Sequence, residues 1–180
     1  MAVERRRNSR DRPPLDAAAL EALALFYVAR YATTRSKLAR YLERKLRERG
    51  WSGSEAPPIE RIVGRAGSLG YVDDRAFAAA RAAALAGRGY GERRIREALR
   101  AAGIEEEDSL PARRSVRGEA WQSALRLAER RRIGPFASGI PDRAAAQKAL
   151  AILLRAGHPP DLARRVAYAP PGEIPEPDEA

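Results

Sequence analysis

The sequence predicts an all-α protein of three tandem three-helix repeats, stacked into an elongated, curved array that is right-handed or solenoid-like. Apolar residues recur at helical spacing through the middle of the chain, and no stretch alternates apolar and polar residues in the manner of a strand. Three glycines that follow helical stretches, Gly50, Gly103 and Gly157, lie 53 and 54 residues apart. A leucine stands four residues before each glycine, so the period predicts a repeated helical unit.

The first repeat is predicted over residues 14–70. Asp16 is placed to cap its first helix, and Thr33 or Thr34 is placed to cap a second helix that ends at Gly50. A third helix is expected from about Pro58 to Leu69, because proline is tolerated in the first turn of a helix.

The second repeat is predicted over residues 71–116. Its helices are expected from Asp74 to about Ala86 and from about Glu92 to Ala102. The signal for a third helix is weak here, because residues 105–108 are all acidic and Pro111 follows them.

The third repeat is predicted over residues 117–169 and is the most divergent, with a short last helix over Pro160–Ala167. Two tails are expected to be disordered. Residues 1–13 are basic, with five arginines against two acidic side chains. Residues 170–180 are acidic and rich in proline, which excludes a helix.

The composition favours a polyanionic partner. The 180 residues carry a formal net charge of +10, which suits nucleic acid, an anionic membrane surface or an acidic protein face. The absence of cysteine excludes disulfides, zinc ribbons and thiol catalysis. Residues 1–12 lack the apolar segment of a secretory signal, and the apolar run Ala17–Ala29 is too short to cross a bilayer. We therefore expect a cytoplasmic protein with no membrane contact.

No motif predicts a catalytic, cofactor or metal site. Asp73 and Asp74 open a helix, where a carboxylate satisfies free N–H groups. The glycine-rich stretch Gly87–Gly91 follows a helix and lacks the Gly-Lys-Ser/Thr of a phosphate-binding loop. His158 is the one histidine, so it has no cysteine or histidine partner for a metal, and no serine has a histidine nearby for activation. We expect a protein that is not an enzyme and needs no cofactor.

Two stretches of the second repeat resemble the RecX family. Residues 70–78, Gly-Tyr-Val-Asp-Asp-Arg-Ala-Phe-Ala, are similar to its Gly-Tyr-Leu-Asp-Asp…Phe-Ala segment, with Val72 in place of the usual leucine. Residues 89–104 are similar to its glycine-rich turn followed by Arg-Ile…Leu…Gly-Ile. Residues 35–51 resemble the preceding Arg-Ser…Leu…Leu…Gly-Phe segment, and the likeness is strongest over residues 15–104.

The resemblance implies a regulator, mainly an inhibitor, of the RecA recombinase in DNA repair, homologous recombination and the SOS response. Such a protein binds the RecA–DNA filament along its helical groove and suppresses strand exchange, ATP turnover and co-protease action. Its implied partners are the RecA filament and, without sequence preference, single- and double-stranded DNA, and it acts as a monomer. A sequence-specific helical DNA-binding protein and an α-helical scaffold for an acidic protein are the alternatives.

Basic residues form one stripe on the predicted second helix of repeat one and another on the predicted second helix of repeat two. The predicted filament or nucleic-acid contacts are Arg35, Lys37, Arg40, Arg44, Arg47, Arg88, Tyr90, Arg93, Arg96 and Arg100. Such stripes suit a phosphate backbone, and the other interpretation is a solvated helix face that pairs with nearby glutamates. Three other aromatic residues are expected in the core: Tyr41, Trp51 and Tyr71.

Overall fold

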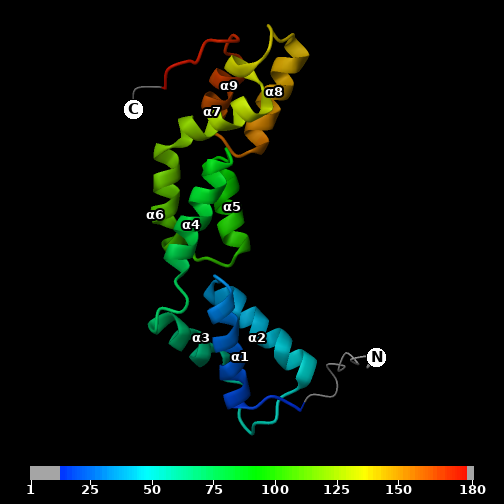
Figure 1. Cartoon of the computed structure of the whole chain (residues 1–180), viewed down its shortest axis with the longest axis vertical. Coiled ribbons are helices and arrows are strands. Elements are labelled where there is room, and N and C mark those ends of the chain that lie inside the picture. The colour runs from blue at the N-terminus through cyan, green and yellow to red at the C-terminus, as the bar shows by residue number, and fades with distance from the viewer. Residues whose placement is uncertain (1–12, 178–180) are drawn as a thin grey trace, which may run out of the picture. The chain divides into compact units, whose positions relative to one another are not determined.

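The computed structural model describes residues 13–177, so the predicted basic tail lies outside the described residues except for Pro13. Over that range the regular elements are nine α-helices and one 3-10 helix (Figure 1). The one isolated β-bridge described joins Leu15 to Trp51. The predicted all-α class is confirmed. The chain divides into two compact units, of which unit 1 ends at Phe77 and unit 2 begins at Ala78.

Unit 1 contains the first three helices, α1 (Ala17–Arg30), α2 (Arg35–Arg49) and α3 (Ile59–Ser68). The predicted caps are confirmed. The Asp16 carboxylate accepts the N–H of Ala19 at 2.8 Å, and the Thr34 hydroxyl accepts that of Lys37 at 3.2 Å. The three helices enclose a core of buried residues: Leu15, Leu20, Ala24, Leu38, Leu42, Ile62, Val63, Ala66 and Val72. Tyr41 and Trp51 pack against this core, as expected.

The two adjacent aspartates start two different helices. Asp73 accepts the N–H of Ala76 at 2.9 Å and so caps α4 (Asp74–Gly87). Asp74 is 5% exposed, and its carboxylate accepts the backbone N–H of Arg35, the first residue of α2, at 3.0 Å. These carboxylates therefore satisfy free N–H groups at helix N-termini, where the helix dipole also favours negative charge.

The prediction that Tyr71 lies in the core is wrong, because its side chain is 53% exposed. Gly70, with φ +74°, turns the chain after α3, and the N–H groups of both Tyr71 and Val72 donate to the carbonyl of Ala66. This turn directs Val72, at 2% exposure, into the core instead.

Unit 2 takes up most of α4 and continues with α5 (Glu92–Ala101) and α6 (Glu106–Gly118). The weak sequence signal for α6 is misleading, since a regular helix forms with Pro111 inside it. Its acidic first turn suits the N-terminal end of a helix, and Ala112 and Val116 are buried. Arg113, at 5% exposure, donates to the carboxylates of Glu92, at 2.6 Å, and Glu106. Packing and this ion pair offset the one backbone hydrogen bond that a proline removes.

The remaining elements are α7 (Ala120–Arg131), the 3-10 helix η2 (Gly134–Phe136), α8 (Arg143–Arg155) and α9 (Pro160–Ala167), the last with the predicted bounds. They surround their own core of Ala124, Leu127, Ala128, Ala149, Leu153, Ala156, Ala163, Val166 and Ala167. No described residue after α9 is helical. In this segment the N–H of Gly172 donates to the carbonyl of Pro135 at 2.8 Å.

The glycines that define the predicted period lie at corresponding places in the order of helices. The N–H groups of Gly103 and Gly157 donate to carbonyls three residues earlier, whereas that of Gly50 donates to Leu46, four residues earlier. Gly50, Gly103 and Gly157 follow α2, α5 and α8, and their φ angles are +80°, +75° and +94°. Only glycine adopts this left-handed region without steric cost, which explains its recurrence. The order of helices thus agrees with the predicted period, with one glycine of positive φ after the middle helix of each group of three. None of the described helices combines the length and apolar character that a membrane span needs.

Replacing Gly157 by alanine should destabilise unit 2 more than Gly70→Ala destabilises unit 1. At Gly157 an added Cβ would lie 2.5 Å from the backbone nitrogen of Arg94, whereas at Gly70 nothing lies within 4 Å. We expect a loss of about 1–2 kcal/mol for Gly70→Ala, from the left-handed backbone alone, and a larger loss for Gly157→Ala. Urea unfolding followed by circular dichroism measures both. Gly87→Ala, in open space at a helix end, is the control and should not destabilise; equal effects at Gly157 and Gly70 would contradict the close approach.

Candidate functional site

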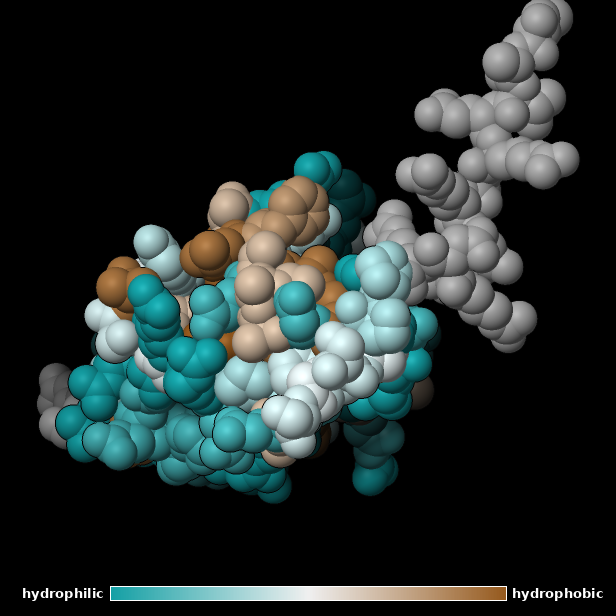
Figure 2. Space-filling model, turned by 90° about the horizontal axis from the view of Figure 1, so that it is seen from below, coloured by the Kyte–Doolittle hydropathy of each residue, from teal (hydrophilic) through white to brown (hydrophobic). Residues whose placement is uncertain are grey.

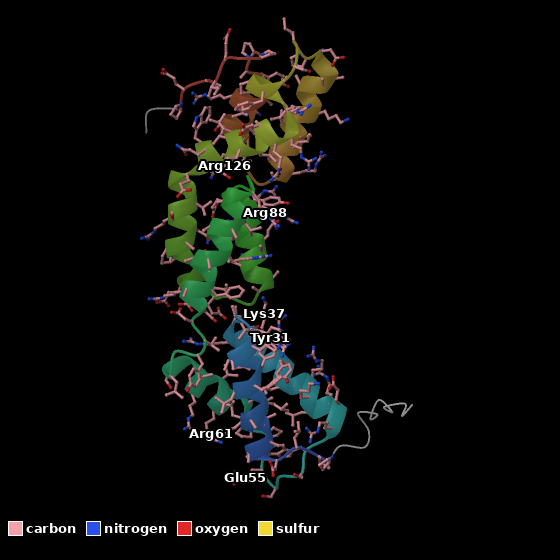
Figure 3. The ribbon with its side chains drawn as sticks, in the orientation of Figure 1. Tyr31, Lys37, Glu55, Arg61, Arg88 and Arg126 are labelled. Atoms are coloured by element: carbon pink, nitrogen blue, oxygen red, sulfur yellow. The ribbon has the colours of Figure 1, made fainter. Side chains whose placement is uncertain are left out.

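The predicted basic stripe on α2 is exposed but partly neutralised. Arg40, Arg44 and Arg47 are exposed, whereas Lys37 is half-buried with its Nζ 4.7 Å from the centre of the Phe77 ring (Figure 3). Arg44 lies 3.6 Å from the carboxylate of Glu48. The hydrogen bond from Lys45 to that carboxylate, at 2.6 Å, is the main reason why the pKa of Glu48 lies below its ordinary value. Arg35 is exposed at the start of the helix.

The predicted residues around α5 have different environments. Arg88, in the turn between α4 and α5 and labelled in Figure 3, is exposed. Arg100 is also exposed, and Arg96 is half-buried. Arg93 donates to the carbonyl of Leu154 at 2.7 Å and to the carboxylate of Glu97 at 3.1 Å. Arg93 therefore links α5 to the last turn of α8, and part of its hydrogen-bonding capacity is used within unit 2.

Tyr90 is the one aromatic residue among the predicted contacts, and it is half-buried against the α7–α9 core. Its carbonyl accepts the hydroxyl of Ser123 at 3.0 Å. The same turn contacts His158, which is 3% exposed and lies with Nε2 2.9 Å from the carbonyl of Gly89. Because a carbonyl can only accept, Nε2 carries the proton and donates.

The helices α5, α7 and α8 enclose an open groove with a volume of about 710 Å³, which we call the basic groove. It is lined by Tyr90, Arg93, Arg94, Glu97, Leu127, Arg130, Arg131, Ile152, Arg155 and Ala156. Five guanidinium groups thus face one carboxylate. Both Arg93 and Arg94 pair with that carboxylate, at 3.1 and 3.4 Å. Arg130, Arg131 and Arg155 are exposed and form no ion pair with the residues described.

Four arginines of the basic groove were missed from the sequence: Arg94, Arg130, Arg131 and Arg155. A signal for three of them exists, because Arg130 and Arg131 form the last turn of α7 and Arg155 ends α8. Basic residues are common in that position, since they interact favourably with the helix dipole. Their convergence depends on how α5, α7 and α8 pack, which no local pattern reveals. Only Tyr90 and Arg93 of the predicted contacts line this groove.

The chemistry of the basic groove is that of anion binding. A guanidinium group presents several N–H donors in a planar fork that matches two oxygens of a phosphate or carboxylate. Between residues 13 and 177 no group of three histidine, cysteine or acidic side chains is arranged to hold a metal ion. The carboxylate of Glu97 in this groove is paired with Arg93 and Arg94, and the arginines outnumber it, so the arrangement fits anion binding.

Comparisons with known proteins agree with this fold and extend over nearly the whole chain. The sequence profile described as “RecX, second three-helix domain” matches residues 73–109, which span α4, α5 and the start of α6. The regulatory protein RecX of Myxococcus xanthus (strain DK1622) is 32% identical over 160 residues, which cover 84% of this chain and 86% of the relative. The chain belongs to the RecX family.

A second RecX relative, the regulatory protein RecX of Thermobifida fusca (strain YX), is 30% identical over 173 residues, with 91% of this chain and 88% of the relative covered. A crystal structure of regulatory protein RecX superimposes with a TM-score of 0.61 at 22% identity, over 83% of this chain and 72% of that one. This likeness shows that the chain has a RecX fold. The basic groove therefore lies in a chain of a regulatory family, and the comparisons indicate no catalytic family.

Acid should weaken unit 2 through His158. Burial holds the pKa of His158 below its ordinary value of 6.5, against a smaller opposing effect of the Gly89 carbonyl, and Nδ1 has no hydrogen-bond partner in the described structure. The folded state therefore favours neutral imidazole. This contribution to stability is complete above pH 6.5 and is lost as the pH falls through the lowered pKa. Urea midpoints at pH 7.5, 6 and 5 should fall further for the wild type than for His158→Gln, and parallel curves would exclude this role.

Proposed function

We propose that this chain regulates the RecA recombinase by binding the RecA–DNA filament. It acts mainly as an inhibitor, which suppresses the filament's ATPase, strand exchange and co-protease activities. It works as a monomer in the cytoplasm. The single observation that supports this most strongly is the similarity to two regulatory proteins named RecX, because it covers 84% and 91% of the chain.

Within this function, we propose that the basic groove contacts the phosphates of filament DNA. The groove brings together five exposed arginines, of which Arg93 and Arg94 pair with Glu97, and phosphate contacts from such residues carry no sequence information. Tyr90 at the groove offers an aromatic face on which a base can stack. Contact with single- and double-stranded DNA is therefore expected to be independent of sequence. The exposed arginines of α2, the exposed Arg88 and Arg100 and the half-buried Arg96 are proposed as additional contacts.

A sequence-specific DNA-binding protein is the main alternative, and it needs one helix whose side chains reach base edges in a fixed frame. The arginines of the basic groove come from three different helices, which favours backbone contact. An α-helical scaffold for an acidic protein is the other alternative. It predicts binding to its partner that does not depend on nucleic acid.

The wild-type protein should inhibit the ATPase of RecA on single-stranded DNA at less than one molecule per RecA subunit, because one molecule on a filament affects many subunits. Steady-state ATP hydrolysis at increasing protein concentration measures this. An unchanged rate at an excess over RecA would contradict the proposed function. A strong preference for one duplex sequence in a competition assay would favour the main alternative.

The triple variant Arg130→Ala, Arg131→Ala, Arg155→Ala should bind bare single-stranded DNA more weakly and with less dependence on salt. If all three contact phosphates, the slope of log affinity against log salt should decrease by roughly 2, at about 0.7 for each contact on a single strand. Fluorescence anisotropy over a salt series measures the slope.

The matched control is Arg81→Ala, Arg114→Ala, Arg143→Ala, which removes the same charge from exposed positions of α4, α6 and α8. None of these three arginines lines the basic groove. Equal slopes for the two triple variants would mean that net charge, and not the groove, sets the affinity for DNA.

A further inference from the structure

Helix α1 has a second apolar face that the core of unit 1 does not cover. Among its 14 residues only Glu21 and Arg30 are charged. The face opposite Leu20 consists of residues spaced by three or four positions, which forms one stripe along a helix. This α1 stripe consists of Ala18, Ala22, Leu25, Phe26 and Ala29, all of which are exposed. Leu25 is 54% and Phe26 61% exposed. Apolar side chains grouped in this way on the surface are unusual, because polar residues could occupy the same positions.

The α1 stripe borders a groove between α1 and α3, which we call the apolar groove. Its volume is about 190 Å³, and it is lined by Glu21, Ala24, Leu25, Val28, Arg61, Ile62, Arg65, Ala66, Leu69 and Tyr71. The far wall is formed by Leu69 and Tyr71, which are 55% and 53% exposed. On the face that Figure 2 views, the hydrophobic residues gather in one area instead of being scattered. Stripe and groove together form a continuous apolar surface on unit 1.

The charges at the edge of this surface are mainly positive. Arg61 and Arg65 stand on the α3 side, and Arg30 stands at the end of α1 (Arg61 is labelled in Figure 3). The one carboxylate in the groove, that of Glu21, is bound by Arg61 at 3.0 Å. A ligand that fits must therefore place apolar groups in the groove and anionic groups at its edge.

This charge pattern separates the possible occupants. A second copy of this chain would bring the same arginines to the interface, and each copy carries a net charge of +10. A nucleic acid has phosphates for the arginines but no aliphatic ridge to fill an apolar groove. An amphipathic helix with an apolar ridge between acidic flanks supplies both, and laying such a ridge in a groove is a recurrent mode of protein recognition.

We propose that the α1 stripe and the apolar groove bind an acidic amphipathic helix of a protein partner. This part of the proposal is argued from residues of unit 1 alone. The further assignment of that helix to the protein subunits of the filament rests on the proposed function. Unit 1 then contacts filament protein through apolar side chains, whereas the basic groove of unit 2 contacts phosphates.

The first experiment uses the full chain and three labelled helical peptides. One peptide has leucines at helical spacing with glutamates on both flanks, the second has lysines in place of the glutamates, and the third has serines in place of the leucines. The wild type should bind the leucine–glutamate peptide at least about tenfold more tightly than the other two in fluorescence anisotropy. Similar affinities for the leucine–glutamate and serine–glutamate peptides would overturn the proposal, because the binding would then be charge attraction alone.

Two variants locate the binding. Leu25→Ser with Phe26→Ser removes the largest side chains of the stripe, and Arg65→Glu reverses the charge at the edge. Both should lose most of the affinity for the leucine–glutamate peptide. The matched control, Ile140→Ser with Ile174→Ser, removes side chains that are 91% and 57% exposed elsewhere, and it should bind as the wild type does. Equal binding by stripe variant and control would overturn the proposal. So would a wild-type dimer in sedimentation that the stripe variant dissociates, since the occupant would then be a second copy.

The same variants on RecA-coated single-stranded DNA test the assignment to the filament. The stripe variant should lose about tenfold or more in affinity for the filament and keep its affinity for bare single-stranded DNA. If the stripe variant loses its affinity for the peptide but keeps its affinity for the filament, the surface binds another protein and the assignment to RecA fails. If the wild type itself does not bind the filament, the proposed function fails. The peptide measurement still decides whether this surface binds an acidic amphipathic helix.

Discussion

The structure depends on a backbone constraint that recurs after α2, α5 and α8. At each of these points a glycine with positive φ turns the chain, a conformation that costs other residues about 1–2 kcal/mol. In unit 2 the turn at Gly157 also lies against Gly91. Its carbonyl oxygen would be 2.4 Å from a Cβ added at Gly91. Two glycines thus allow the α4–α5 turn and the α8–α9 turn to touch. This contact brings Arg93 and Arg94 beside the last turns of α7 and α8, and so creates the basic groove.

Local signals in the sequence predicted most of the helices. Asp16, Thr34 and Asp73 cap where their side chains indicated, because a cap depends on residues only three positions away. Tyr71 and α6 show the limit. Tyr71 had core-like spacing, but the left-handed Gly70 shifted the inward position to Val72. The local signal for α6 was weak because it does not include the contact of Arg113 with Glu92, which lies 21 positions away.

The candidate site was harder to predict than the fold for the same reason. Stripes of arginine on one helix can be read from spacing, but a groove needs side chains from several helices. Arg130, Arg131 and Arg155 come from α7 and α8, which the contact prediction did not include. Conversely, Arg93 was predicted as an outward contact and also holds the carbonyl of Leu154, so a substitution there would alter packing as well as charge. The charge of +10 predicts the kind of partner, whereas the place where we propose that it binds follows only from the packing.

The apolar groove can bury apolar side chains, whereas the basic groove can bind phosphates. A filament of protein and nucleic acid contains a partner of each kind. Amide hydrogen exchange of the full chain, free, with bare single-stranded DNA and with RecA-coated DNA, tests this most directly. Regulation by filament binding predicts slower exchange in the last turns of α7 and α8 with either form of DNA. It predicts slower exchange in α1 and α3 with the RecA filament only. Exchange that the RecA filament leaves unchanged throughout residues 13–177 would contradict it.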